Sequence, residues 1–154
     1  MKTLRTIFAL FFFAVGIQLA QAQSEHYYTN ENMVVLDGYD VVNYFTNYEA
    51  AMGSKSHATT HNGVVYYFTS AEHKAMFTAN PEKYMPAYGG FCAWGVSEKK
   101  SKFPVDPKTF KIHNGNLYFF FNSHYDGEPM NTMIPWNGDE AKMISKADKN
   151  WKSM

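Results

Sequence analysis

The sequence has 154 residues, enough for one domain with a hydrophobic core, and carries 14 basic and 14 acidic residues. A chain with no net charge has no electrostatic reason to bind nucleic acid or an anionic membrane surface, so we expect neither partner.

The first 22 residues have the order of a secretory signal peptide. Lys2 and Arg5 precede an apolar stretch at residues 7–17, and Ala20-Gln21-Ala22 has the small-x-small pattern of a cleavage site. The apolar stretch spans 11 residues, whereas a membrane-spanning helix needs about 20. We therefore expect a cleaved leader, a mature chain that begins at Gln23 in the periplasm or outside the cell, and no stable membrane anchor.

A polar leader at residues 23–32 precedes the single domain that we expect over residues 33–154. Asn-Gly between β-favouring runs is the strongest short-range signal of a β-hairpin. The sequence has two such pairs, Asn62-Gly63 between residues 58–61 and 64–68, and Asn114-Gly115 between residues 109–112 and 117–121.

A helical pattern follows the first hairpin. Thr69 or Ser70 can cap a helix, and Glu72, three residues after Thr69, fits a capping box. The helix should end near Ala79, because the residue before Pro81 disfavours helix.

The rest of the chain adds a predicted strand at residues 91–96 and a last helix from about Asp139 to Trp151. Tyr66 and Phe68 share one strand face, and together with Phe77 on the following helix they predict an aromatic core. We therefore predict an α+β fold, a small antiparallel sheet made of hairpins with helices packed on it.

Cys92 is the one cysteine of the chain. A lone cysteine cannot form an internal disulfide, so four roles stay open: a buried small residue, a metal ligand, a reactive thiol or an intermolecular bridge.

A family resemblance rests on several segments. Residues 65–84 contain an aromatic strand, a helix that begins after Ser70, and a closing Pro-x-x-Tyr, with Gly38–Phe45 before them and Tyr88–Ala93 after them. Further matches are Asp106-Pro107, Asn114-Gly115-x-Leu117-Tyr118 and Asn150-Trp151. This combination resembles the YHS domain, in particular its exported, stand-alone members, over about residues 33–151.

The resemblance implies a treble-clef-like core of a kind that binds metal through cysteines. Relatives fused to heavy-metal pumps carry Cys-x-x-x-Cys at the strand–helix junction, where this chain has Thr69 and His73, and Asp-Pro-x-Cys where it has Asp40–Asn43. A tetrahedral structural zinc site needs four ligands, so the loss of these cysteines argues against one.

A copper site remains the leading functional hypothesis. His73 stands where the resemblance implies a ligand, and Met76 at i+3 shares its helix face. Cys92 and Met85 follow soon after in the sequence and complete a set of soft ligands of the kind that Cu(I) prefers. We expect an accessory protein that handles or sequesters copper, with Cys92, His73, Met76 and Met85 as the metal ligands.

Two alternatives stay open. The chain can be a metal-free binding or interaction domain that keeps the fold and has lost the site. It can also be a thiol enzyme in which Cys92 and His73 act as a thiol–imidazole pair, the minor alternative because the sequence contains no recognised catalytic motif.

Overall fold

The computed structural model describes residues 25–154, so the predicted signal peptide lies outside the described residues. The helices are α2 (Asn43–Thr46), α3 (Ala71–Ala79), α4 (Ala93–Lys99), α5 (Met133–Trp136) and α6 (Glu140–Trp151), with short 3-10 turns at Leu36–Gly38, Pro81–Lys83 and Ala87–Gly90. The strands are β1 (Ser54–His61), β2 (Val64–Phe68), β3 (Asp106–His113), β4 (Asn116–Phe120), β5 (Asn122–Tyr125) and β6 (Glu128–Asn131). This mixture of helices and antiparallel strands confirms the predicted α+β class.

Both predicted hairpins form. Asn62 and Gly63 have φ values of 49° and 76°, and Asn114 and Gly115 have 49° and 78°, as a two-residue turn with both centres in the left-handed region requires. The strands do not join into one sheet, however. They make three separate antiparallel pairs, β1–β2, β3–β4 and β5–β6, and the third pair was not predicted.

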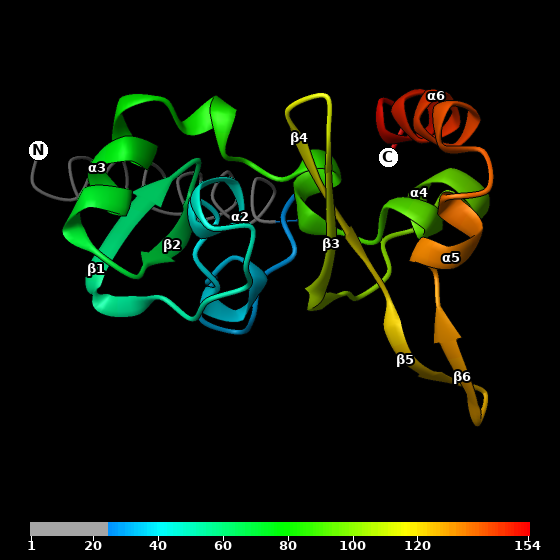
Figure 1. Ribbon diagram of the computed structural model, residues 1–154, viewed down its shortest axis with the longest axis horizontal. Coiled ribbons are helices and arrows are strands. Elements are labelled where there is room, and N and C mark those ends of the chain that lie inside the picture. The colour runs from blue at the N-terminus through cyan, green and yellow to red at the C-terminus, as the bar shows by residue number, and fades with distance from the viewer. Residues whose placement is uncertain (1–24) are drawn as a thin grey trace, which may run out of the picture.

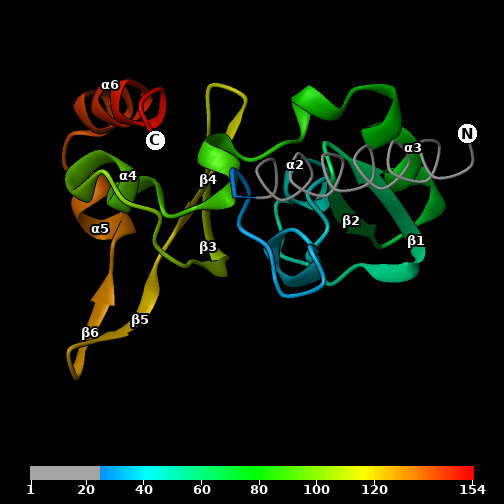
Figure 2. The same cartoon turned by 180° about the vertical axis from the view of Figure 1, so that it is seen from behind.

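Strand β4 lies between two hydrophobic cores, which explains why the molecule is elongated (Figure 1 and, from behind, Figure 2). Side chains alternate along a strand, so Leu117 and Phe119 enter the first core while Tyr118 and Phe120 enter the second. The first core is otherwise built from Val35, Leu36, Val41, Val42, Tyr44, Val64, Tyr66, Phe68, Phe77 and Tyr84. The second is otherwise built from Tyr88, Ala93, Val96, Trp136 and Ala147.

The aromatic core predicted around the first hairpin is confirmed. Tyr66, Phe68 and Phe77 are each exposed by 1% or less. The Phe77 ring centroid lies 4.5 Å from that of Tyr66 and 5.2 Å from that of Phe68. Helix α3 therefore packs directly on strand β2.

Helix α3 ends at Ala79 as predicted, but its capping residue differs from the predicted capping box. The hydroxyl of Ser70 accepts a hydrogen bond from the backbone N–H of His73 at 3.1 Å. Ser70 is therefore the N-cap, and the Thr69 hydroxyl instead donates to Asp40.

The predicted strand at residues 91–96 is wrong, since Ala93–Lys99 form helix α4. A short apolar run does not distinguish a strand from a buried helix by periodicity, and tertiary contacts decide here. The side chain of Asn150 on α6 donates to the carbonyls of Val96 and Ser97 at the end of α4, at 2.9 Å each.

Helix α6 is the predicted last helix, and a carboxylate ties it to the second hairpin. Glu140 accepts from Lys111 at 2.9 Å, from the Trp136 indole at 3.0 Å and from His113 at 3.1 Å. Burial favours the neutral acid, but the hydrogen bonds from Lys111 and Trp136 outweigh it and hold the pKa of the Glu140 carboxyl below its ordinary value.

The described part of the polar leader packs on the body of the molecule. The Tyr28 N–H donates to the Gly89 carbonyl at 2.8 Å, and Tyr27 and Tyr28 lie against the first core. Gly89 has φ of 62°, and a Cβ there would lie 1.7 Å from the His26 carbonyl oxygen, so only glycine permits this docking.

None of the helices within residues 25–154 is long and apolar enough to cross a membrane.

Candidate binding pocket

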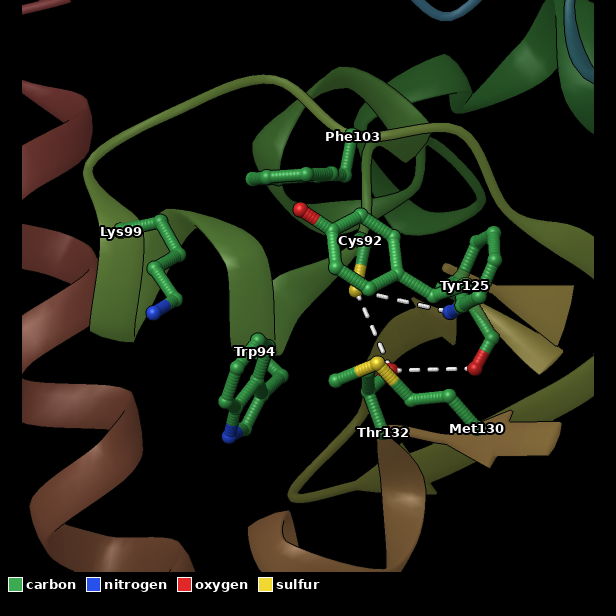
Figure 3. A pocket seen from close by; sticks show the side chains of 8 residues that line it. Cys92, Trp94, Lys99, Phe103, Tyr125, Met130 and Thr132 are labelled. Carbon is green, nitrogen blue, oxygen red and sulfur yellow. Dashed lines mark hydrogen bonds between the residues drawn. The ribbon is translucent and has the colours of Figure 1, made fainter. Parts of the chain in front are cut away.

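A pocket of about 150 Å³ opens where helix α4 faces the β5–β6 hairpin (Figure 3). Segments far apart in the sequence build it, and its lining residues are Cys92, Trp94, Lys99, Phe103, Phe121, Tyr125, Met130 and Thr132. Seven of these eight side chains carry no charge at neutral pH, and four are aromatic. The pocket is therefore an apolar cavity with one cation, Lys99, at its edge.

A closed ring of hydrogen bonds forms the floor of the pocket. Cys92 is fully buried, and its Sγ lies 3.3 Å from Thr132 Oγ1. The Thr132 hydroxyl donates to the Phe121 carbonyl at 3.1 Å, and the Phe121 N–H donates to Cys92 Sγ at 3.4 Å. Since the hydroxyl proton is already used, the thiol proton must point to Thr132 Oγ1. Every polar atom of the ring then has a hydrogen-bond partner.

The walls depend on a glycine in helix α4. A Cβ at Gly95 would lie 2.6 Å from Phe103 Cδ2, so the absence of a side chain lets the Phe103 ring lie against the helix. Lys99, one turn further on, places its Nζ 5.7 Å from the centroid of the Trp94 ring. Lys99 and Tyr125 are both exposed, Tyr125 by 60%, and they mark the open side of the pocket.

The β5–β6 hairpin contributes one of its two faces. Ser123 pairs with Met130 across the hairpin, and Tyr125 lies two residues beyond Ser123. Residues at this spacing share a strand face, so Tyr125 and Met130 reach the pocket from the same side while His124 lies on the other face. Met130 brings a second sulfur into the pocket that holds Cys92.

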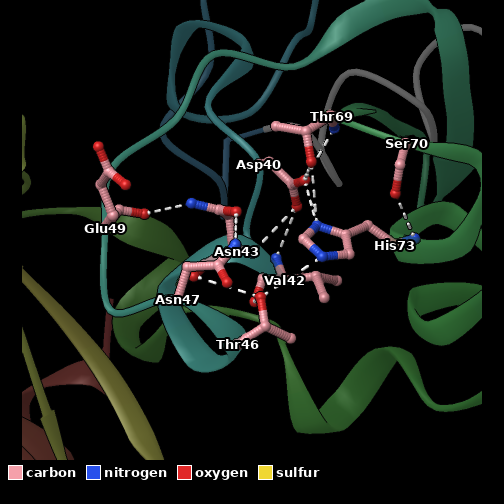
Figure 4. A network of polar contacts seen from close by, with 9 residues as sticks. All are labelled: Asp40, Val42, Asn43, Thr46, Asn47, Glu49, Thr69, Ser70 and His73. Atoms are coloured by element: carbon pink, nitrogen blue, oxygen red, sulfur yellow. Dashed lines mark hydrogen bonds and ion pairs between the residues drawn. The ribbon is translucent and has the colours of Figure 1, made fainter.

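His73 lies elsewhere, in a buried polar network centred on Asp40 (Figure 4). One Asp40 oxygen accepts from the N–H groups of Val42 at 2.9 Å and Asn43 at 3.2 Å. The other accepts from the Thr69 N–H at 2.8 Å, the Thr69 hydroxyl at 2.7 Å and His73 Nδ1 at 2.7 Å. Asp40 and its partners thus join the chain before α2 to the β2–α3 junction.

The second ring nitrogen of His73, Nε2, lies near the hydroxyl of Thr46. Because the Asp40 carboxylate only accepts, His73 Nδ1 carries a proton, and Nε2 lies 3.4 Å from Thr46 Oγ1. The His73 side chain is 13% exposed. Thr69 and His73, at which the resemblance implies ligands, are therefore both occupied as hydrogen-bond partners of one carboxylate.

The structure places Cys92 and His73, two of the four predicted metal ligands, in different surroundings. Cys92 precedes α4 and pairs with Phe119 of the central strand β4, whereas His73 lies on α3, at one end of the molecule (Figures 1 and 2). Met76 and Met85 both pack against the first core, and Met85 also lines a different pocket together with His26 and Trp151. Among residues 25–154, no three His, Cys, Asp or Glu side chains are grouped closely enough to hold a metal ion. Closeness in sequence to helix α3 did not bring Cys92 to it, because the chain passes from the first core to the second between Met85 and Tyr88.

Sequence reasoning identified Cys92 but missed Tyr125, Met130 and Thr132. A signal for them exists. Asp126-Gly127 is a third hairpin pair of the kind used for the other two, and its φ values are 53° and 83°. Recognising that turn would have paired Ser123 with Met130 and placed Tyr125 on the same face.

No family model, curated protein or solved structure matches this chain.

Proposed function

We propose that this chain is an exported, metal-free binding protein that takes a small, largely apolar molecule into the Cys92 pocket. The observation that carries the proposal is the pocket itself, an apolar cavity of about 150 Å³ whose polar floor is internally satisfied. Concave sites lined by aromatic side chains with a few placed polar groups are the usual form of small-molecule sites. The Asp40 network supports the metal-free part, because it satisfies Thr69 and His73 without a metal.

Export is supported by the Lys2 and Arg5 charges, the apolar stretch and the Ala-Gln-Ala pattern at residues 20–22. Intact mass of protein isolated from its natural source tests this part of the proposal. A chain that still carries residues 1–22 would contradict it.

A pocket-filling substitution tests the binding site. In Met130→Trp the larger side chain should occupy the cavity, whereas His124→Trp adds the same indole to the opposite face of the hairpin. We expect fragments of up to about ten non-hydrogen atoms to shift the backbone amide resonances of Cys92, Phe121 and Thr132 in wild type and in His124→Trp. The shifts should disappear in Met130→Trp.

Protein-observed NMR with the two variants measures this directly. If no fragment shifts these resonances in wild type, or if Met130→Trp responds as wild type does, the pocket is not a ligand site and the proposal is wrong. Circular dichroism of both variants controls for their folding.

Copper binding is the second candidate, and one observation favours it. Cys92 and Met130 place a thiol and a thioether in the same pocket, and Cu(I) is a soft ion that such ligands select. Binding would require Cys92 to lose its proton, so the affinity should fall as the pH falls. This ligand pair differs from the predicted set, because His73 belongs to the Asp40 network and does not line the pocket.

A competition titration with a Cu(I) chelator under anaerobic, reducing conditions distinguishes the predicted ligand set from the Cys92–Met130 pair. If copper binds in the pocket, Cys92→Ser should remove most of the affinity and Met130→Leu should weaken it about tenfold. His73→Gln should leave the affinity unchanged. Equal binding by wild type and Cys92→Ser would exclude Cys92 as a ligand, and a loss in His73→Gln would place the copper at α3.

A further inference from the structure

The size of the Cys92 pocket limits what it can hold. A cavity of about 150 Å³ lined by apolar side chains is large enough for one benzene-sized molecule. Two fused rings or a long alkyl chain would extend beyond the lining residues. One six-membered ring is therefore the largest group that the pocket can enclose.

The walls favour an aromatic ring over a saturated one of the same size. Trp94, Phe103, Phe121 and Tyr125 bring four aromatic side chains to the cavity, from helix α4, the loop after it, and the stretch from the end of β4 through β5. Aromatic rings gain from edge-to-face and offset contacts with each other beyond the area that they bury. A saturated ring fills the same volume without these contacts.

The floor requires that the inner end of the ligand be apolar. The thiol, the Thr132 hydroxyl and the Phe121 N–H all donate within this ring, so none of them has a free donor for a ligand. A carboxylate pushed down to this floor would lose its hydration and gain no donor, which is unfavourable. The polar part of the ligand must lie at the mouth.

The mouth carries one positive charge. Lys99 is the single charged residue among the eight that line the pocket, and none of the ion pairs within residues 25–154 involves it. The neighbouring Glu98 is paired with Lys146 at 3.1 Å and points its charge there. The ammonium at the mouth is thus free to pair with an anionic group of a ligand.

We infer that the pocket takes a small aromatic carboxylate of the benzoate type, with its ring against the Cys92 floor and its carboxylate at Lys99. The inference rests on the proposed function and names its ligand class. For a ligand of about nine non-hydrogen atoms, the expected Kd is on the order of 0.1–1 mM.

The test uses three probes on the purified protein: benzoate, benzyl alcohol and cyclohexanecarboxylate. Benzyl alcohol keeps the ring without the charge, and cyclohexanecarboxylate keeps the charge without the aromatic ring. NMR titration followed at the amides of Cys92, Phe121 and Thr132 gives each Kd. Benzoate should bind more tightly than either of the other two.

Two lysine variants isolate the charge. Lys99→Met keeps the aliphatic stem over Trp94 and removes the ammonium, while Lys100→Met makes the same change at an exposed neighbour that does not line the pocket. Lys99→Met should weaken benzoate binding about three- to fivefold, as suits an exposed ion pair, and should leave benzyl alcohol unaffected. Lys100→Met should bind both probes as wild type does.

Each failure has a separate meaning. Equal benzoate affinity in wild type and Lys99→Met overturns the anionic part of the inference, and equal affinity for cyclohexanecarboxylate overturns the aromatic part. If none of the three probes binds but other fragments enter the pocket, the ligand class is wrong while the proposed function stands. If nothing enters the pocket, both are wrong.

Discussion

Replacing Phe77 with alanine is expected to lower the free energy of unfolding by about 3–5 kcal/mol. Phe77 is 1% exposed, and its ring packs between helix α3 and strand β2 against Tyr66 and Phe68. Truncation removes a buried aromatic side chain and leaves a cavity that rigid neighbouring rings cannot close. Urea titration of wild type and variant measures the loss.

The surroundings of Phe77 favour a stability loss in the lower half of that range. His61 Nε2 and Tyr66 Oη are buried and have no hydrogen-bond partner among the described residues, and both rings contact Phe77. Water that enters the new cavity can bond these two atoms and offset part of the cost. Thr78→Ala is the matched control: its side chain is exposed and bonds only to the Lys74 carbonyl, so we expect a change within about 0.5 kcal/mol. Equal stability of Phe77→Ala and Thr78→Ala would contradict the predicted core.

The parts of the fold that the sequence predicts well are those fixed by local backbone chemistry. The Asn-Gly pairs specify turns that need positive φ at both centres. Helix α3 ends at Ala79 because the ring of Pro81 clashes with a helical conformation of the residue before it. The α+β class follows from these elements. None of these features depends on which parts of the chain meet in space.

The predictions fail where contacts between distant parts of the chain determine the secondary structure or the sheet pairing. Residues 91–96 are an apolar run that fits a strand or a buried helix, and their position between β4 and α6 selects the helix. The division into three separate sheets could not be predicted either. It depends on β4 presenting Leu117 and Phe119 to one core and Tyr118 and Phe120 to another.

The candidate site shows the same limit. Cys92 stood out from the sequence because it is the one cysteine, and it lines the pocket. Its partners there, Met130 and Thr132, lie about forty residues further along the chain, so no local pattern connects them to it. The predicted partner His73 is nearer in sequence, but it belongs to the Asp40 network on α3.

The second large effect is expected at Asp40, the buried centre of the network that contains His73. Asp40→Ala should lower the free energy of unfolding by about 3–5 kcal/mol, because it leaves the backbone N–H groups of Val42, Asn43 and Thr69 without their acceptor. The carboxylate is fully buried, so water reaches these groups poorly. Urea titration again measures the change.

The unfolding free energy of Asp40→Asn should lie between those of Asp40→Ala and wild type, because an amide can replace only part of the hydrogen bonds of the carboxylate. If the amide NH₂ turns toward Val42 and Asn43, it meets two backbone N–H groups that cannot reverse their polarity. Turned toward Thr69 and His73, it meets only one, because the imidazole can change tautomer and the Thr69 hydroxyl can rotate. One unsatisfied N–H predicts a loss of about 1–3 kcal/mol. Asp37→Asn is the control, an exposed aspartate whose φ of 54° asparagine tolerates well.

The same variants decide whether hydrogen bonds or a metal ion hold this junction, where the resemblance implies metal ligands at Thr69 and His73. If the Asp40 network is sufficient, a metal chelator should leave the unfolding free energy of wild type unchanged, since no bound ion contributes to it. The losses in Asp40→Ala and Asp40→Asn should then be the same with and without chelator. If instead the chelator lowers the unfolding free energy of wild type to that of Asp40→Ala, a metal ion stabilises the junction and the metal-free proposal is wrong. A stability that chelation does not change, combined with a graded loss from aspartate through asparagine to alanine, is the result that hydrogen bonds to a single carboxylate predict.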